Sequence, residues 1–407
     1  MTTATSALPV RAERLWAALL AATLMNLPLG SVYSFSVLLR PIEQDLGVGR
    51  SALSLVFGLA TVGFTVGSVG APLFYRLAPA PVLLIGCALV AAAGLGLAAT
   101  ATTLAPLIVG YGLAFGTGGG VAFILLQQGV NMLVRTRQGL VNGYVVSLYP
   151  MGAMLATPAF HACNEAFGWR TTLAGLATVV LLCGVAAAAL SRLSGGRLAP
   201  AARAAGTTTD EEPARPPIWG ITFFKLAATF FLAAAAGLMV LSQAREIVAT
   251  YGGAPVLAVA ATTGLTGAIA LARISGGWLT DRFPVPFVMG AAHALALGGG
   301  LLLTLFPAPV TAVAGLGFIG LGYGFVSGAT AGGIALYWHR SDYGRVAGRT
   351  YIAWCLAAIS LPVLAGHLFD LTRQYETAVL IAAAANITGL ALALTLPRKG
   401  WREVPPT

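Results

Sequence analysis

The stretch Ala270-Leu-Ala-Arg273-Ile-Ser-Gly-Gly277-Trp-Leu-Thr-Asp281-Arg282 ends a long apolar run with a charged pair and carries one further cation inside the run. The eight residues from Arg273 to Asp281 span about 12 Å of α-helix. If Asp281 marks the membrane–water boundary, Arg273 lies within the hydrocarbon region, where a cation costs at least roughly 2.5–3.5 kcal/mol. Every other charged residue can be assigned to a loop or a segment end. Arg273 is therefore the first candidate for a binding residue.

The composition of the 407-residue chain is that of an integral membrane protein. Hydrophobic residues make up 57% of it and charged residues 9%, whereas soluble domains contain about 25% charged residues. A net charge of +10 would suggest nucleic acid for a soluble domain, but here it reflects membrane topology, and no nucleic-acid partner is expected. The apolar run after Arg11 and Arg14 is too long for a signal peptide and predicts a first spanning helix.

Twelve apolar segments are long enough to cross a bilayer as helices, which takes about 20 residues each. They cover residues 15–39, 51–74, 81–100, 105–134, 139–161, 169–191, 219–244, 254–280, 285–306, 309–337, 346–367 and 375–396. The predicted fold class is an all-α membrane protein with twelve transmembrane helices.

Basic residues divide unequally between the two sides of the predicted membrane. Seventeen fall on one side: Arg11, Arg14, Arg76, Arg135, Arg137, Arg192, Arg197, Arg203, Arg215, Lys225, Arg282, Arg340, Arg345, Arg349, Arg398, Lys399 and Arg402. Five fall on the other: Arg40, Arg50, Arg170, Arg245 and Arg373. Because positively charged loops stay in the cytoplasm, both termini and the long central loop are predicted to be cytoplasmic, in the inner (plasma) membrane.

A polar linker divides the twelve segments six plus six. It contains Gly195-Gly196, Asp210-Glu-Glu212 and Pro213. We expect an N-terminal half over residues 1–192, a cytoplasmic linker over 193–218, and a C-terminal half with a short cytoplasmic tail over 219–407.

The two halves are similar in sequence at a nearly constant offset of 205 or 206 residues. The matching pairs are Leu20-Ala-Ala-Thr23 with Leu226-Ala-Ala-Thr229, Tyr75-Arg-Leu77 with Asp281-Arg-Phe283, Gly110-Tyr-Gly112 with Gly315-Leu-Gly317, and Gly139-Leu-Val-Asn-Gly143 with Gly344-Arg-Val-Ala-Gly348. Such internal symmetry indicates two pseudo-symmetric copies of one six-helix unit.

Two six-helix halves, a central loop and the sequence Gly277-Trp-Leu-Thr-Asp281-Arg282 resemble the major facilitator superfamily of secondary transporters. The resemblance covers nearly the whole chain. It implies the major facilitator fold, transport by alternating access, and a gating motif formed by Gly277, Asp281 and Arg282. In the first half, Tyr75 stands where this motif has an aspartate.

Three stretches resemble the oxalate–formate antiporter and monocarboxylate transporter group within the superfamily: Gly30-Ser-Val-Tyr33-Ser-Phe-Ser36, Leu39-Arg-Pro-Ile-Glu43 and Gly366-His-Leu-Phe-Asp370. Arg273 in the eighth segment fits the same group, which implies carboxylate transport. A guanidinium is a planar fork of donors that matches a carboxylate and stays protonated at physiological pH, so Arg273 is predicted to bind the substrate. The alternative is that it snorkels to the interface or bonds backbone carbonyls.

Aromatic and amide residues are predicted to surround Arg273. The resemblance implies roles for Tyr33, Tyr323 and Phe123, the last at a position where the group has a tyrosine. The remaining intramembrane amides are Asn26, Gln127 and Gln128. Each can bond a substrate or hold helices together.

The predicted site holds one formal charge. Oxalate carriers have a second cation in a Tyr-x-Ala-Lys pattern, where this chain has Tyr351-Ile-Ala-Trp354. Trp354 has Tyr149 as its repeat partner, so both rings are expected to line the cavity, with helix packing or interfacial anchoring as the alternative. The repeat partner of Arg273 is Gly67. One cation beside aromatic rings suits a monoanion with an apolar body better than a small dianion.

No acidic residue lies in the interior of a predicted segment, since Glu376 stands at the outer end of the last one, so the usual carrier for proton coupling is missing. Animal-type monocarboxylate–proton symporters have an Asp one turn before the arginine and a Lys in the first segment, where this chain has Ile269 and Val37. A proton would travel with the substrate or on His293, a lone histidine of a kind more typical of packing. Symport with a proton, exchange for a counter-anion and uniport all stay open.

No enzyme, metal or cofactor chemistry is indicated by the sequence. It contains no Ser-His-Asp arrangement and no metal-ligand spacing, and Cys87, Cys163, Cys183 and Cys355 show no CxxC pattern. The Gly116-Thr-Gly-Gly-Gly120 cluster lies inside an apolar helix and indicates close helix packing, not phosphate binding.

These features predict a monomeric secondary or facilitative transporter of small organic anions, with monocarboxylates as the favoured class. Efflux of amphipathic drugs or metabolites is an alternative that fits the aromatic, low-charge cavity, but no acid lies in the first or fourth segment. A non-transporting membrane sensor or assembly partner is a third interpretation. It would be expected to carry an additional soluble domain, and the sequence predicts none.

Overall fold

The computed structural model describes residues 7–198, 216–372 and 374–400, which form helices, turns and no strand. The first half contains α1 (Ala7–Gly30), η1 (Ser31–Ser34), α2 (Ser36–Leu46), α3 (Arg50–Gly70), η2 (Ala71–Arg76), α4 (Ala80–Ala99), α5 (Leu104–Leu107), the π-helix η3 (Ile108–Phe115), α6 (Gly116–Leu133) and α7 (Gln138–Leu193). The second contains α8 (Ile221–Thr250), α9 (Pro255–Thr280), α10 (Val285–Leu305), α11 (Pro309–Tyr337), η4 (Arg340–Asp342), α12 (Tyr343–Ile359), α13 (Leu361–Thr372) and α14 (Glu376–Leu394).

Eleven helical stretches of the described residues are long and apolar enough to cross a membrane. One of them, α7, has 56 residues, or about 84 Å of helix, whereas the hydrocarbon core is about 30 Å thick. Gly168 interrupts α7 with a φ of 80°, a positive value that glycine adopts without strain. Since α7 therefore crosses the membrane twice, the structure accounts for the twelve predicted spans.

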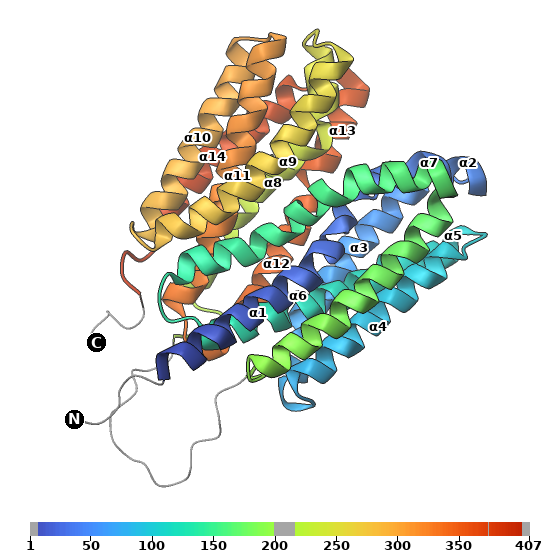
Figure 1. Cartoon of the computed structure of the whole chain (residues 1–407). Coiled ribbons are helices and arrows are strands. Elements are labelled where there is room, and N and C mark those ends of the chain that lie inside the picture. The colour runs from blue at the N-terminus through green and yellow to red at the C-terminus, as the bar shows by residue number, and fades with distance from the viewer. Residues whose placement is uncertain (1–6, 199–215, 373, 401–407) are drawn as a thin grey trace.

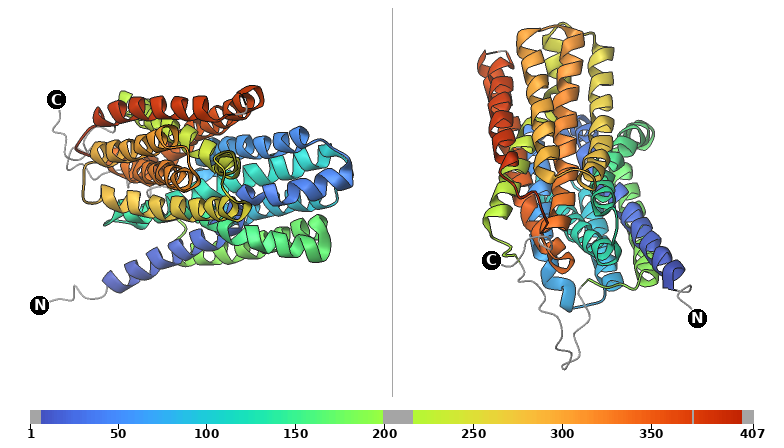
Figure 2. Two further views of the ribbon diagram at one scale, coloured as in Figure 1. Left: turned by 90° about the horizontal axis from the view of Figure 1, so that it is seen from above. Right: turned by 90° about the vertical axis from the view of Figure 1, so that its left-hand side faces the viewer.

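The spans form two bundles, α1 to α7 and α8 to α14, whose ribbons lie close together at one end and diverge at the other (Figure 1). Seen from above, the two bundles lie side by side (Figure 2). The start of α1 and the end of α14 lie at the joined end, which we call the terminal end. This arrangement is the predicted major facilitator fold.

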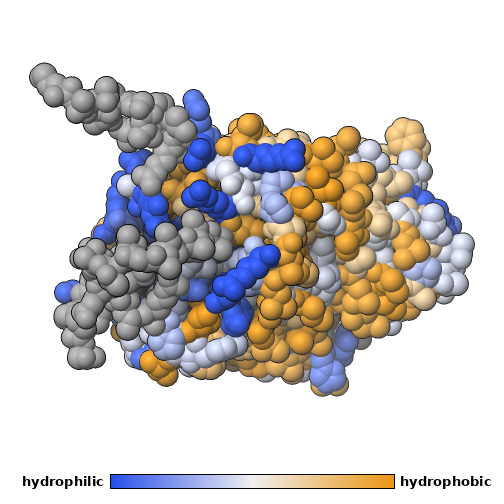
Figure 3. Space-filling model, turned by 90° about the horizontal axis from the view of Figure 1, so that it is seen from below, coloured by the Kyte–Doolittle hydropathy of each residue, from blue (hydrophilic) through white to orange (hydrophobic). Residues whose placement is uncertain are grey.

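The outer surface of the helices is apolar. Val66, Leu182 and Leu271 are 60–67% exposed, and hydrophobic residues cover much of the face in Figure 3, while hydrophilic residues gather towards one end. Helices satisfy their own backbone hydrogen bonds, so such a surface is stable against lipid. The protein is a multi-pass membrane protein.

Glycines bring the two halves into backbone contact at the terminal end. A Cβ atom added to Gly139 on α7 or to Gly277 on α9 would overlap the backbone of the other residue, and one on Gly143 would lie 2.6 Å from the carbonyl oxygen of Arg273. On the opposite side of the repeat, a Cβ on Gly348 in α12 would overlap the carbonyl of Ser68 in α3. The repeated Gly-x-x-x-Gly pairs thus support close helix crossings between the halves.

The Gly116–Gly120 cluster makes contacts of the same kind within the first half. A Cβ on Gly116 would lie 2.5 Å from the carbonyl oxygen of Ala60 in α3, and one on Gly118 would lie 2.9 Å from that of Cys87 in α4. The prediction that these glycines serve helix packing is confirmed.

The predicted gating motif caps a helix across the interface between the halves. Both carboxylate oxygens of Asp281 accept hydrogen bonds from the start of α7, from the N–H of Gly139 at 2.7 Å and that of Leu140 at 2.8 Å. A carboxylate at a helix N-terminus pairs with unbonded N–H groups and with the positive end of the helix dipole. Arg282 instead lies over the ring of Trp278, 3.8 Å from its centroid.

Gln128 provides the equivalent helix cap in the other copy of the repeat, where Tyr75 replaces the aspartate. The Oε1 atom of Gln128 accepts a hydrogen bond of 2.8 Å from the N–H of Gly344 at the start of α12. Its Nε2 atom donates to the carbonyls of Leu198 and Arg340. This amide therefore holds helix ends together and serves a structural role, one of the two alternatives that the sequence left open.

Candidate substrate-binding site

Arg273 on α9 is buried where the two halves meet. Its Nη1 donates to the carbonyl oxygen of Val146 on α7 and its Nη2 to the hydroxyl of Tyr323 on α11, both at 2.9 Å. Among the described residues no carboxylate forms an ion pair with it, and its Nε is buried without a hydrogen-bond partner. The guanidinium therefore lacks the anion that normally offsets the cost of burying a charge.

Tyr323 holds the guanidinium of Arg273 in position through its hydroxyl group. Its hydroxyl oxygen also accepts a hydrogen bond of 3.1 Å from Nε1 of Trp354. The two bonds occupy both lone pairs of the oxygen and leave its own proton to be donated. Tyr323 does not line the cavity next to Arg273, so its position is that of a support for the guanidinium and not of the predicted cavity wall.

The cavity next to Arg273 is small in this conformation, about 10 Å³. Its lining comes from both halves: Tyr33, Phe64, Phe123, Val146, Tyr149, Phe230, Arg273, Ser327, Tyr351 and Trp354. Such a volume corresponds to about one water molecule. A molecule larger than water would reach Arg273 only after the surrounding side chains move apart.

Four rings, which we call the ring layer, separate this cavity from a second one of about 20 Å³. The layer consists of Tyr33, Phe64, Tyr149 and Trp354, which line both cavities. The ring of Tyr33 lies 6.4 Å from that of Tyr149 and 6.2 Å from that of Trp354, in edge-to-face geometry. Pairs of this kind attract each other by about 0.5–1.5 kcal/mol. The ring layer is thus a cohesive apolar wall beside the buried cation.

Comparison with known families identifies the family to which this fold belongs. The family model of the Major Facilitator Superfamily matches residues 15–362. The chain belongs to the Major Facilitator Superfamily. It is therefore a transporter of small molecules and not an enzyme.

One mouse protein and one rat protein are similar to this major facilitator along most of its length. Monocarboxylate transporter 11 of Mus musculus is 26% identical over 94% of this chain and 87% of that protein. Monocarboxylate transporter 13 of Rattus norvegicus is 26% identical over 83% of this chain and 79% of that protein. Among solved structures, the proton:xylose symporter XylE aligns with a TM-score of 0.73 at 14% identity over 97% of this chain and 98% of that one, which shows the shared fold alone.

Most of the residues predicted from the sequence of this major facilitator lie around Arg273. Tyr33, Tyr149, Trp354 and Phe123 line the cavity, and the ring of Phe123 lies 5.1 Å from that of Tyr149. Gln127 lies in an adjoining cavity of about 20 Å³, with its Oε1 buried and without a hydrogen-bond partner.

The structure does not bring Asn26 or His293 to this cavity. Asn26 is fully buried in α1 and lines none of the three cavities described around Arg273. His293 on α10 is fully buried and hydrogen-bonded through Nδ1 to Oδ1 of Asn386 on α14 at 2.9 Å. Its surroundings are those of a packed helix interface.

Five lining residues escaped the sequence-based prediction: Phe64, Val146, Phe230, Ser327 and Tyr351. Two of them could have been predicted from their spacing in the sequence. Tyr351 precedes Trp354 by three residues and thus shares its helix face, and Phe64 precedes Gly67, the repeat partner of Arg273, by the same spacing. The others are apolar or small and resemble any other helix residue in this sequence.

Proposed function

We propose that this major facilitator is a secondary active or facilitative transporter of small organic anions, with monocarboxylates as its main substrate class. One observation carries the proposal: Arg273 is a buried guanidinium between the halves that has no described carboxylate partner. Its Nε–H is a buried donor without a hydrogen-bond partner. A carboxylate supplies both the missing charge and an acceptor.

The surroundings of Arg273 favour a singly charged substrate with an apolar body. The lining contains one cation and no described carboxylate or second cation, and most of the other side chains are aromatic. The names of the relatives as monocarboxylate transporters point the same way. We propose Tyr33, Tyr149, Phe123, Trp354 and Gln127 as the residues that contact the substrate during transport, with Tyr323 as a positioning residue.

The proposed topology follows the charge distribution of the sequence. Residues 1–192 and 219–407 form the two halves, residues 193–218 the linker, and both termini lie in the cytoplasm of a cell whose inner (plasma) membrane holds the protein as a monomer. The terminal end then faces the cytoplasm. Gly277 and Asp281 close this end, and substrate enters from the opposite side through the ring layer.

Counter-flow in proteoliposomes tests the proposed function. Vesicles loaded with an unlabelled monocarboxylate are expected to accumulate labelled monocarboxylate transiently, to accumulate oxalate more weakly, and to leave a labelled amphipathic cation unaffected. A parallel series with an imposed pH gradient separates proton symport from exchange and uniport. Accumulation of the amphipathic cation without that of any acid would contradict the proposal and support drug efflux.

Replacing Trp354 with lysine is expected to shift the preference towards dianions. Trp354 lines the cavity, so a lysine at this position adds a second cation beside Arg273. One favourable charge pair corresponds to about a tenfold change in relative affinity. The measurement is the inhibition of monocarboxylate uptake by oxalate. Trp354→Phe, which removes the bond to Tyr323 without adding charge, is the control; an unchanged ratio for Trp354→Lys would place residue 354 outside the transport path.

A further inference from the structure

A cavity of about 640 Å³ lies at the terminal end, apart from the site around Arg273. It is bounded by the ends of α1, α4, α6 and α7 and by η4. It shares no lining residue with the cavities around Arg273. This cavity, which we call the basic cavity, is therefore not part of the proposed transport site.

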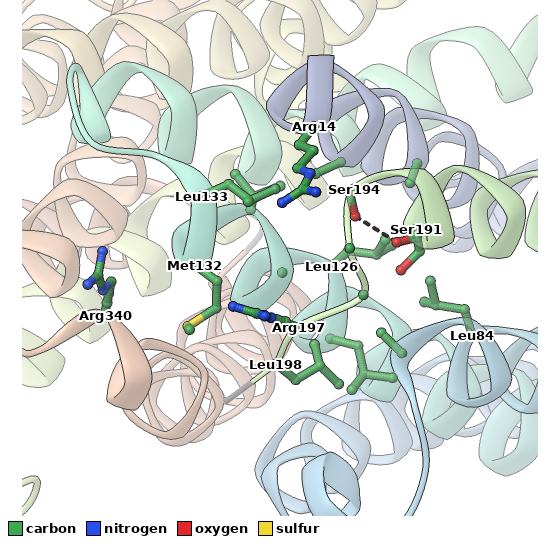
Figure 4. A pocket seen from close by; sticks show the side chains of 18 of the residues that line it. Arg14, Leu84, Leu126, Met132, Leu133, Ser191, Ser194, Arg197, Leu198 and Arg340 are labelled. Atoms are coloured by element: carbon green, nitrogen blue, oxygen red, sulfur yellow. Dashed lines mark hydrogen bonds between the residues drawn. The ribbon is translucent and has the colours of Figure 1, made fainter. Parts of the chain in front are cut away.

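Four arginines from separate segments line the basic cavity: Arg14, Arg135, Arg197 and Arg340. Figure 4 shows Arg14 and Arg197 reaching into it from different sides. No Asp or Glu of the described residues lines it. Like charges gathered in one cavity repel one another, so an anion bound there lowers the free energy of the arrangement.

Three of these arginines have no described ion-pair partner. Arg14, Arg197 and Arg340 take part in none of the ion pairs between described residues. The Nη1 atom of Arg340 is also buried without a hydrogen-bond partner. The positive charges of these three arginines are therefore not offset by a described carboxylate.

Besides the arginines, the lining contains apolar residues, glycines, two serines and His339. The larger apolar side chains include Leu84, Leu125, Leu126, Val130, Met132 and Leu133. Ser191 and Ser194 add hydroxyl groups, that of Ser194 donating to the carbonyl of Ser191 at 2.8 Å. A basic rim around an apolar floor is complementary to an anion that carries an apolar chain.

We propose that the basic cavity binds the phosphate headgroup of an anionic phospholipid. Guanidinium forks match phosphate oxygens, and basic cavities between the cytoplasmic ends of spanning helices lie at headgroup level. A soluble phosphate offers the same charge, but it has nothing to place on the apolar floor. Phosphatidylglycerol therefore fits the whole cavity better than inorganic phosphate does.

The bound headgroup would join the two halves. Arg340 belongs to the second half, Arg14 and Arg135 belong to the first, and Arg197 lies at the start of the linker that follows α7. The halves are in contact at this end in the present conformation. A lipid that contacts both of them favours this closed end over an open one, because a ligand stabilises the state that it binds better.

Native mass spectrometry of the purified full-length protein tests the proposal. Phosphatidylglycerol, phosphatidylcholine, inorganic phosphate and glycerol 3-phosphate are titrated into the wild type and into the double variant Arg14→Gln/Arg197→Gln. The double variant Arg76→Gln/Arg192→Gln is the matched control, because both residues are exposed and neither lines the cavity. The wild type is expected to bind phosphatidylglycerol at least tenfold more tightly than the cavity variant, while the control changes less than twofold.

Other outcomes overturn the proposal. Equal losses in the cavity variant and the control would mean general attraction to a positive surface. Displacement of phosphatidylglycerol by inorganic phosphate or glycerol 3-phosphate at similar concentrations would mean a soluble ligand. Arg340→Gln provides a second test in case the double variant does not fold, and it is expected to weaken phosphatidylglycerol binding in the same direction. Wild-type binding by Arg340→Gln would contradict the assignment.

Discussion

Replacing Arg273 with glutamine is expected to reduce carboxylate transport on the order of 100-fold or more. Glutamine removes the charge and the planar fork that Arg273 presents beside the ring layer. Loss of one partner from a buried hydrogen-bonded charge pair costs about 2–5 kcal/mol, which corresponds to a factor of about 30 to several thousand. The measurement is counter-flow of labelled monocarboxylate, normalised to the amount of protein in the membrane.

The amount of folded Arg273→Gln protein is not expected to fall. The guanidinium is buried and has no described carboxylate partner, so removing its charge also removes a desolvation cost. Arg273→Lys keeps the charge but not the fork, and it should retain part of the transport. Wild-type rates in the glutamine variant would show that Arg273 does not bind the substrate.

Replacing Gly277 with alanine is expected to abolish transport by preventing closure of the terminal end. The added Cβ would overlap the carbonyl of Gly139 and lie 2.8 Å from Cα of Gly143 on α7. These are backbone atoms of the other half, which cannot rotate away as a side chain can. The halves are therefore pushed apart at this end, and alternating access loses one of its two states.

Hydrogen exchange gives a readout of Gly277→Ala that does not depend on transport. The N–H groups of Gly139 and Leu140 are bonded to Asp281 across the interface, and separation of the halves should expose them to faster exchange. Gly298→Ala is the matched control, because a Cβ on this glycine of α10 meets nothing within 4 Å. Protected amides and normal counter-flow in Gly277→Ala would contradict the proposed role of this crossing.

At the terminal end, different chemical groups cap the corresponding helices of the two halves. Asp281 caps α7 with a charge, whereas the neutral Gln128 caps α12, because Tyr75 replaces the aspartate in the first half. The sequence shows that Tyr75 departs from the motif. The residue that compensates for it could not be predicted, since Gln128 lies on α6, 53 positions further along the chain.

From the amino-acid sequence we could predict the membrane class, the twelve spans, the two similar halves and the exceptional position of Arg273. Each of these follows from the order of residues along the chain: the length of an apolar run, a constant offset between repeats, or a charged residue inside an apolar segment. The π-helix at Ile108–Phe115 and the merging of two spans in α7 left no such mark.

The side chains that surround Arg273 could be identified from the packing of the helices and not from the sequence. In a soluble helix, a polar face and an apolar face show which side is buried. In these spans the lipid-facing and the packed sides are both apolar, so the sequence does not reveal how each helix is rotated. The ring layer, the bonds of Arg273 to Val146 and Tyr323, and the basic cavity all depend on that rotation, because each joins segments distant in the chain.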